Sequence, residues 1–506
     1  MLGILDKSKG LAVSALFALC VAPTFISYQP YRFRWDDSDY FQRSIAVSQA
    51  FWTGNVHGLG AMVSVRPPAM TLLGLPWGPL TSWDSAGKCF ITLTALISLL
   101  AVLCLYLLLR IGLKPVFLVA ASLCVFAAIG PYPRGANAHV TATAFLSDSL
   151  FAWTVLAAVL LIPYEARTHC SSIRGAVVRG IFWGSILSLG AMTKVSFFCF
   201  IVLIVPALFM IRLRNSGVRP AFAAFISFAC CSMPSAFYLL RWGRPAFSNA
   251  KLSSFGGLAD FYYTPLLQFL DNNIRASPGL MLSFAFVIAA LLYIVIKKRT
   301  VVWSPDFMAV LIVMGFSMIV LASTNREIRF SFPVIVALPF LTAILMSGTG
   351  NMAPGRSAAF AAGLIFCCLL MACVPTRHRA DREQSLGRSE GVLAQVARCN
   401  AKRIVLATDS PTLNGNLMNL AIEVSEPRTS FQVDTLAYPV SKGRPIEEDF
   451  RVMSKSDEVI FQDRDALSPP YTNRRASEYE RYLRQGGYAS IRVADDVTVY
   501  AIRCTP

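Results

Sequence analysis

Residues 89–109 read CFITLTALISLLAVLCLYLLL, an apolar run of 21 residues without a charged side chain. A helix rises 1.5 Å per residue, so this run would be about 30 Å long, which matches the hydrocarbon core of a bilayer. The whole chain of 506 residues shares this character, since 55% of it is apolar and 15% charged, with a mean hydropathy of +0.54. We therefore expect a membrane-spanning helix here and a membrane-dominated protein around it.

Ten further runs of this kind predict a polytopic all-α membrane protein of about 11 transmembrane helices. The first run ends without a small-x-small cleavage site, so it is interpreted as a retained anchor. The expected spans lie near Leu11–Tyr28, Cys89–Leu109, Pro115–Ile129, Phe145–Pro163, Val177–Met192, Phe197–Leu213, Ala221–Leu240, Leu280–Ile296, Phe307–Ala322, Phe332–Met346 and Ala358–Val374.

The net charge of +17 does not indicate nucleic-acid binding, because the basic residues are spread over short loops between the apolar runs. With the N-terminus in the cytoplasm, the inner loops are short, basic and almost free of acid, as the positive-inside rule expects. Eleven spans then place everything after about Pro375 on the extracytoplasmic side. The inner basic residues are Arg110, Lys114, Arg167, Arg174, Arg179, Arg212, Arg214, Arg219 and Lys297–Arg299.

The composition divides the chain into a membrane domain, residues 1–375, and a soluble extracytoplasmic domain, residues 376–506. The membrane domain has two long outer loops, 29–88 and 241–278. In the soluble part, apolar strands alternate with helices, which is typical of a small α/β domain. Cys399 and Cys504 lie in this domain and either pair with each other or stay as thiols. Strands are expected at 403–408, 430–436, 458–462 and 491–503, and helices at 391–399, 416–424 and 475–485.

An unusual acidic run, Trp35-Asp36-Asp37-Ser38-Asp39-Tyr40, follows the first apolar span. Downstream, Phe41, Ile45, Ser48 and Trp52 are spaced like one face of a helix, which we expect to lie along the membrane surface. Asp36 or Asp37 would stand at its N-terminus, where the helix dipole favours an ionised carboxylate. Such a group is either a functional anion or an ordinary N-cap.

On this topology several charged residues at helix ends share the outer face of the membrane. Arginine and lysine there suit an anionic phosphate, and a carboxylate can act as base on a hydroxyl. Asp148 heads an apolar span, where a lone carboxylate is costly. The alternatives are that Arg326 and Arg329 anchor at the interface, that Lys194 snorkels, and that His139 is incidental. The residues concerned are Asp36, Asp37, Asp39, Arg66, Arg134, His139, Asp148, Lys194, Arg326, Glu327 and Arg329.

Five segments, in this order, make the chain resemble a GT-C superfamily glycosyltransferase. That superfamily includes protein O-mannosyltransferases, aminoarabinose transferases and lipopolysaccharide glycosyltransferases. The resemblance covers about residues 10–375. The first-loop pair is Asp-Asp rather than the frequent Asp-Glu, and the residue before Pro-Pro is Arg rather than the Lys of some members. The segments are Asp36–Phe41 with Ile45, Ala46 and Gly54 downstream, Arg66–Met70, Phe145–Phe151, Met192–Lys194 and Glu327–Pro333.

The resemblance implies an inverting transfer of a sugar from a polyprenyl-phosphate donor to a lipid, glycan or protein acceptor, at the extracytoplasmic face of the cell (inner) membrane. It assigns Asp37 as the base, with Asp36 as the second candidate and Asp39 left solvated. Asp148 would orient the acceptor or share a Mg²⁺ or Mn²⁺ ion with Asp37, and metal use varies within the superfamily. The donor phosphate would be held by Arg66, Lys194, Arg326 and Arg329.

Two other interpretations stay open at this point. A transporter or flippase of lipid-linked sugars would use the same acids and arginines, although it would need polar residues near the middle of the spans. An inactive relative would keep the fold without the reaction.

Overall fold

A computed structural model of the chain describes residues 35–55, 66–81, 85–129, 147–170, 172–255, 266–267, 278–297, 304–323, 331–348, 384–408, 413–424, 431–436, 445–462 and 475–502. These residues fall into two compact units. The membrane unit holds residues 66–70 and 93–348. The sheet unit holds residues 35–55, 71–92 and 384–502.

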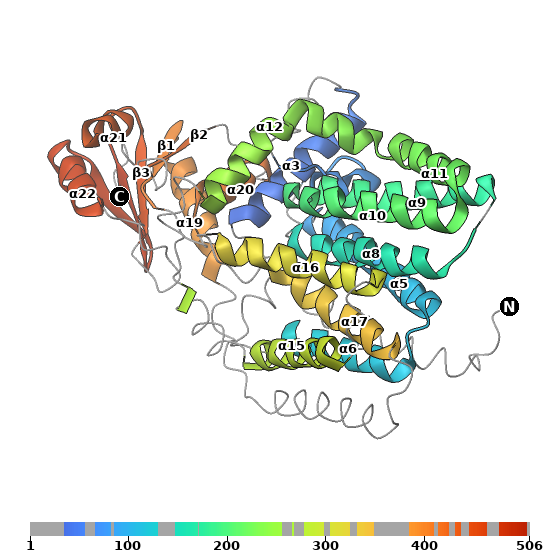
Figure 1. Ribbon diagram of the computed structural model, residues 1–506. Coiled ribbons are helices and arrows are strands. Elements are labelled where there is room, and N and C mark those ends of the chain that lie inside the picture. The colour runs from blue at the N-terminus through green and yellow to red at the C-terminus, as the bar shows by residue number, and fades with distance from the viewer. Residues whose placement is uncertain are drawn as a thin grey trace. The chain divides into compact units, whose positions relative to one another are not determined.

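The membrane unit is built from apolar helices, which are drawn in Figure 1. Within the described ranges, five helices are long and apolar enough to cross a membrane, or six if the bent pair α11–α12 is one span, and shorter apolar helices lie in α15 and α17. The protein is therefore a multi-pass membrane protein. The helices are α5 (Ser85–Ile111), α6 (Pro115–Ile129), α8 (Ser147–Arg167), α9 (Ile173–Thr193), α10 (Phe198–Ser216), α11 (Val218–Cys231), α12 (Met233–Phe255), α15 (Pro278–Lys297), α16 (Pro305–Ala322) and α17 (Phe332–Gly348).

The expected fold class is confirmed, whereas the count of eleven spans is not. Of the expected spans, Leu11–Tyr28 and Ala358–Val374 lie outside the described residues. The expected span Ala221–Leu240 is not one straight helix, because α11 and α12 meet at an angle of 56°. Moreover, α12 continues as a helix to Phe255, well into the stretch that the sequence assigns to the second outer loop.

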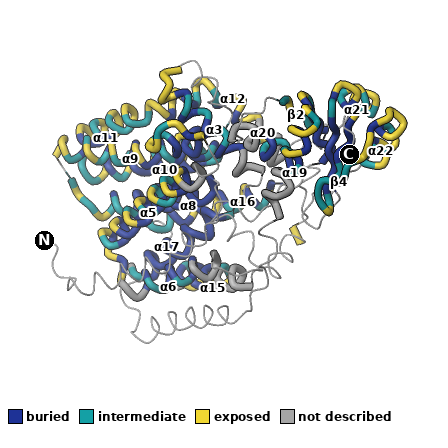
Figure 2. Tube along the Cα trace, turned by 180° about the vertical axis from the view of Figure 1, so that it is seen from behind, coloured by how far each residue is buried: buried dark blue, intermediate teal, exposed yellow. Residues whose placement is uncertain are grey.

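Helix α8 lies at the centre of the membrane unit, packed by α9, α10, α16 and α17. Every residue from Ser147 to Pro163 is buried, and Figure 2 shows α8 dark along its length. Its sequence is apolar on all sides, which is typical of a helix that lies in a protein core or crosses a membrane. This packing fixes the two ends of α8, which carry the charged residues of interest.

Helices α9 and α11 approach each other closely at two glycines. A Cβ atom added to Gly180 would lie 2.0 Å from the carbonyl oxygen of Ala224, and one added to Gly184 would lie 2.6 Å from Cβ of Cys231. Small residues at such a crossing let two membrane helices come into backbone contact. The α9–α11 pair is therefore specified by glycine at these two positions.

The sheet unit contains a five-stranded sheet of order β2-β1-β3-β5-β4. Strands β1 (Arg403–Leu406), β2 (Gln432–Thr435) and β3 (Glu458–Gln462) are parallel, and β4 (Ala489–Ala494) and β5 (Val497–Ala501) form an antiparallel hairpin. One core lies under α19 (Gln384–Arg398) and α20 (Gly415–Val424), and the other under α21 (Ile446–Met453) and α22 (Ala476–Gln485). Figure 1 shows these helix pairs on the two faces of the sheet.

The predicted α/β pattern of this unit agrees with the structure except in two places. The expected strand Ile491–Arg503 is in fact the β4–β5 hairpin, which turns at Asp495-Asp496. Helix α21 has no counterpart among the predicted elements. It is short, and three of its eight residues are acidic, so its sequence resembles that of a loop.

Candidate functional site

The end of α8 that begins at Ser147 holds an ion pair between two residues that the sequence proposes for the site. Lys194 Nζ donates a hydrogen bond to Oδ1 of Asp148 across 46 positions of sequence. The Asp148 side chain is 4% exposed, whereas that of Lys194 is 23% exposed. Asp148 lies in the first turn of α8. The lysine thus has a buried counter-ion and a partly accessible ammonium group.

Aromatic rings form the floor of this ion pair. Lys194 Nζ lies 5.5 Å from the ring centroid of Phe151, one turn after Asp148, a distance suited to a cation–π contact. Phe151 in turn packs edge-on against Phe197, Phe200 and Phe316, at centroid distances of 6.1 to 6.3 Å. An apolar floor lowers the local dielectric, and this strengthens the attraction of the ammonium for an anion.

The local sequence explains how Lys194 reaches this position. It is the C-cap of α9, and its extended backbone separates α9 from the short 3-10 helix η2 (Val195–Phe197). Phe197 folds back over Gly190, where an added Cβ atom would lie 2.3 Å from the ring. The chain therefore turns sharply at Thr193-Lys194, so that α9 ends and α10 begins beside the first turn of α8.

The segment Arg66–Met70 lies beside the same turn. The backbone N–H of Ala69 donates a 2.8 Å hydrogen bond to the carbonyl oxygen of Met192, two residues before Lys194. Arg66, which is partly buried, belongs to that segment. Three predicted site residues, Arg66, Asp148 and Lys194, are thus brought to one end of the membrane unit, although the phosphate-binding role of Arg66 stays a prediction.

The acidic run lies in α3 (Trp35–Trp52), which belongs to the sheet unit. Asp36 and Asp37 fall in the first turn of this helix, as predicted. The expectation that Asp39 is solvated is wrong: it is 8% exposed and its Oδ1 accepts a 2.9 Å hydrogen bond from Nε of Arg43. Asp39 and Arg43 are four residues apart, so they meet on one face of the helix.

The predicted face of α3 is confirmed at Phe41, Ile45 and Ser48, which are fully buried, whereas Trp52 is exposed. Side chains of α3 also hold the segment Thr71–Leu80. Ser44 Oγ accepts the N–H of Gly74 at 3.0 Å, and Gln49 Nε2 donates to the carbonyl oxygen of Leu80 at 2.7 Å. Helix α20 of the α/β part packs against α3, so the acidic helix is held by its own unit from two sides.

The remaining predicted site residues are not placed. Arg326 and Arg329 lie outside the described residues, as do Glu327, Arg134 and His139. No cluster of three His, Cys, Asp or Glu residues that could hold a metal occurs in the described ranges. The Asp148 carboxylate is engaged by Lys194. A Mg²⁺ or Mn²⁺ ion shared by Asp37 and Asp148 stays a prediction.

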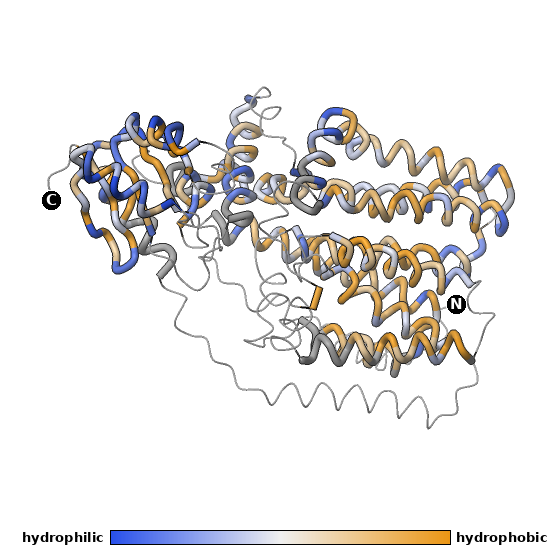
Figure 3. The backbone as a smooth tube through the Cα atoms, turned by 60° about the vertical axis from the view of Figure 1, so that its left-hand side comes forward, coloured by the Kyte–Doolittle hydropathy of each residue, from blue (hydrophilic) through white to orange (hydrophobic). Residues whose placement is uncertain are grey.

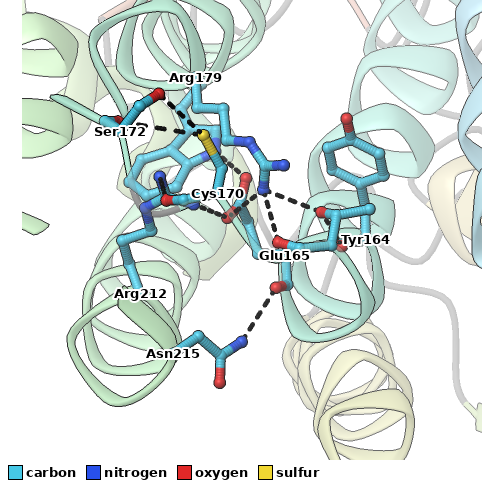
Figure 4. Close-up of polar contacts among 9 residues, drawn as sticks. Tyr164, Glu165, Cys170, Ser172, Arg179, Arg212 and Asn215 are labelled. Carbon is cyan, nitrogen blue, oxygen red and sulfur yellow. Dashed lines mark hydrogen bonds and ion pairs between the residues drawn. The ribbon is translucent and has the colours of Figure 1, made fainter. Parts of the chain in front are cut away.

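A second charged cluster, which the sequence reasoning missed, lies at the other end of α8 (Figure 4). Glu165, which is 1% exposed, accepts a 2.9 Å hydrogen bond from Arg179 of α9, and Arg212 of α10 lies 3.4 Å from the same oxygen. Arg212 also donates to the carbonyl oxygen of Cys170 at 2.6 Å. The signal was present in the sequence as an acid among the inner arginines, yet the sequence could not show that one carboxylate serves two of them.

The two clusters mark the two ends of one buried helix. Asp148 and Glu165 are 17 residues apart in α8, which corresponds to about 26 Å at 1.5 Å per residue. That length is close to the thickness of a bilayer's hydrocarbon core, about 30 Å. The charges of α8 therefore fit the two surfaces of a membrane, with an apolar stretch between them.

The apolar helical bundle and the small C-terminal α/β domain define a GT-C-like membrane fold. A crystal structure of ArnT from Cupriavidus metallidurans, bound to undecaprenyl phosphate, shares this fold with a TM-score of 0.52. The match covers 97% of this chain and 98% of that chain at 14% sequence identity. No protein-family model matches the chain, and no curated protein matches it.

Proposed function

We propose that the protein is an inverting glycosyltransferase that moves a sugar from a polyprenyl-phosphate donor to a lipid, glycan or protein acceptor on the extracytoplasmic side of the membrane. The observation that carries the proposal is the Lys194–Asp148 pair, placed over aromatic rings at the head of the buried α8 in an ArnT-like fold. The structural neighbour holds undecaprenyl phosphate, which supports a polyprenyl-phosphate ligand here as well.

In this proposal Lys194 contacts the donor phosphate, and Arg66 adds a second cation. Lys194 and Asp148 neutralise each other, so the pair alone has little net attraction for an anion, and an arginine must supply the remaining charge. Arg326 and Arg329 are further candidates for that role. Asp148 keeps the ammonium group in place, and Phe151 restricts it from below.

The chemical step needs a base and a stabilised leaving group. Asp37, or Asp36 as the second candidate, removes the proton of the acceptor hydroxyl, whose oxygen attacks the anomeric carbon of the sugar. The bond between that carbon and the phosphate oxygen breaks, and the electron pair leaves with the polyprenyl phosphate. Phosphate is a good leaving group, so cations that stabilise its charge suffice and no general acid is required.

Two observations support the extracytoplasmic side for the site and for the C-terminal domain. Cys399 is disulfide-bonded, and its partner lies outside the described residues. Disulfides persist in oxidising compartments rather than in the cytosol. The end of α8 opposite Lys194 carries the arginine-rich inner loops, which the positive-inside rule places in the cytoplasm.

The distribution of charge supports an enzyme over a transporter. In α8, α9, α10 and α16 the acidic and basic residues lie within the first two or last two turns, and the middle of each helix is free of them. A translocation pathway needs polar sites near the middle of the bilayer. Figure 3 shows the same pattern, with apolar helix bodies and hydrophilic residues gathered at helix ends.

The test is transfer of radiolabel from a panel of polyprenyl-phosphate sugars in membranes that contain the full-length protein. We expect Lys194→Gln to lower transfer on the order of 10²-fold, because it removes a cation that stabilises the negative charge of the leaving phosphate. We expect Asp37→Asn to lower it by at least about 10²-fold, because the base is lost.

Asp306→Asn is the matched control, since it breaks a comparable ion pair, between Arg167 and Asp306, at the other end of the membrane unit. If Asp37→Asn left transfer unchanged, Asp37 would not be the base. If no donor in the panel supported transfer by the wild type, the transferase proposal would fail and transport would become the better explanation.

A further inference from the structure

The ends of α8, α9, α10 and α11 that lie opposite Lys194 form one basic surface. Helix α9 follows α8 after a short connection, and α11 follows α10 after the single residue Gly217. The hydrogen bond from Arg212 to the carbonyl oxygen of Cys170 ties the end of α10 to the connection between α8 and α9. Because these four ends are joined, the charges on them act as one group.

The centre of this surface carries more positive than negative charge. Glu165 is the carboxylate for both Arg179 and Arg212, so the cluster in Figure 4 keeps one positive charge. Arg212 is 1% exposed, and its Nε finds no acceptor among the described residues. The neighbouring ion pair, Arg167 with Asp306, is neutral.

Three exposed arginines lie at the same helix ends: Arg174 in the first turn of α9, Arg214 in the last turn of α10 and Arg219 in the first turn of α11. None of them forms an ion pair within the described part of the chain. Together with the buried excess they leave four uncompensated positive charges at one end of the bundle. A surface of this kind attracts an anion of more than one charge, or several anions side by side.

Each exposed arginine stands beside an exposed apolar side chain on the same helix face. Val178 follows Arg174 by four residues, Met210 precedes Arg214 by four, and Phe222 follows Arg219 by three. The three apolar side chains are between 52% and 62% exposed. Each of them lies one turn further from the basic end, toward the middle of its helix.

This pairing of charge and apolar surface identifies the ligand class. A free phosphate would use the arginines and leave the apolar side chains in water, whereas a lipid satisfies both at once. We propose that Arg174, Arg214 and Arg219, at the same end of the bundle as the Glu165–Arg179–Arg212 cluster, bind the headgroup of an anionic glycerophospholipid whose chains lie along α9, α10 and α11. The site is separate from the donor site at Lys194 and does not depend on the transferase proposal.

Equilibrium binding of radiolabelled phosphatidylglycerol to the detergent-purified full-length protein tests this site. An arginine near an anionic headgroup contributes about 1 kcal/mol, so replacing all three with Gln is expected to weaken binding about 100-fold. Phosphatidylcholine, which carries no net charge, is expected to bind no better to the wild type than to the variant. The charge-conserving triple Lys variant is expected to keep most of the affinity.

The matched control is the triple Gln variant of Arg241, Arg244 and Lys251, three exposed basic residues of α12. It removes the same charge elsewhere and is expected to leave phosphatidylglycerol binding unchanged. Equal loss in both triple variants would overturn the proposal, because binding would then follow net charge. Competition by millimolar inorganic phosphate as effective as that by the lipid would also overturn it, since the site would then recognise a free anion.

Discussion

Glu458, at the start of β3, is a buried carboxylic acid that should make the stability of the sheet unit depend on pH. It is 0% exposed, and neither carboxyl oxygen has a hydrogen-bond partner within the described residues. Burial, and secondarily the negative charge of Asp457, raise the pKa of Glu458 from 4.5 to about 7. The folded protein therefore holds this proton at pH values where the unfolded chain has already lost it.

The sign follows from that difference. Below about pH 4.5 both states are protonated, and the group has no effect on the free energy of unfolding. As the pH rises toward 7 the unfolded chain binds fewer protons than the folded one, so stability falls, and above about pH 7 the loss is complete. With about 1.36 kcal/mol for each pH unit between the two pKa values, the free energy of unfolding should drop by about 2 kcal/mol between about pH 5.5 and about pH 8.5.

The perturbation is Glu458→Gln, which keeps the shape of the side chain and removes the titration. Pulse proteolysis of the full-length protein in detergent, at increasing urea, gives the unfolding midpoint of the sheet unit at each pH. We expect the variant to lack the drop of about 2 kcal/mol that the wild type shows. Glu447→Gln is the control, because Glu447 is exposed on α21 and should leave the pH dependence unchanged. Identical pH dependence in wild type and Glu458→Gln would refute the reasoning.

Three other predictions concern the membrane unit. Asp148→Asn should lower transfer less than Lys194→Gln does and should raise the donor KM, because the ammonium group of Lys194 remains but is no longer held in position by the carboxylate. If Asp148→Asn and the wild type had equal kcat and KM, the ion pair would have no role in the reaction. Gly180→Ala should destabilise the purified protein by about 1–3 kcal/mol and so lower its melting temperature, because the new methyl group meets the backbone of Ala224. An unchanged melting curve would argue against the α9–α11 contact. Burial raises the pKa of Cys170, but hydrogen bonds with Ser172 and Arg212 and the charge of nearby arginines outweigh it and lower the pKa overall. A membrane-impermeant maleimide should therefore label Cys170 quickly at neutral pH from the cytoplasmic side. Labelling from the opposite side would reverse the orientation.

The proposed donor site and the proposed lipid site lie at opposite ends of α8, and their charges are arranged differently. At Asp148 the described residues pair one cation, Lys194, with one buried carboxylate. At Glu165 one carboxylate serves two arginines, and positive charge remains.

The sequence by itself determined the elements that depend on local pattern. Apolar runs such as Cys89–Leu109 predict helices because a bilayer requires about 20 apolar residues to cross it. The helix after Asp37 follows from the 3.6-residue spacing of its buried face, and the strand Glu458–Gln462 was predicted with the bounds that the structure shows.

The tertiary structure alone decided which distant residues meet. Lys194 and Asp148 are far apart in sequence, and their contact exists because α9 packs on α8 and ends at Lys194, where Gly190 leaves room for the ring of Phe197. The burial of Asp39 depends on its own unit closing over α3. Periodicity and propensity describe one segment at a time, whereas the partner of a buried charge is set by the packing of whole helices, and no local pattern encodes that packing.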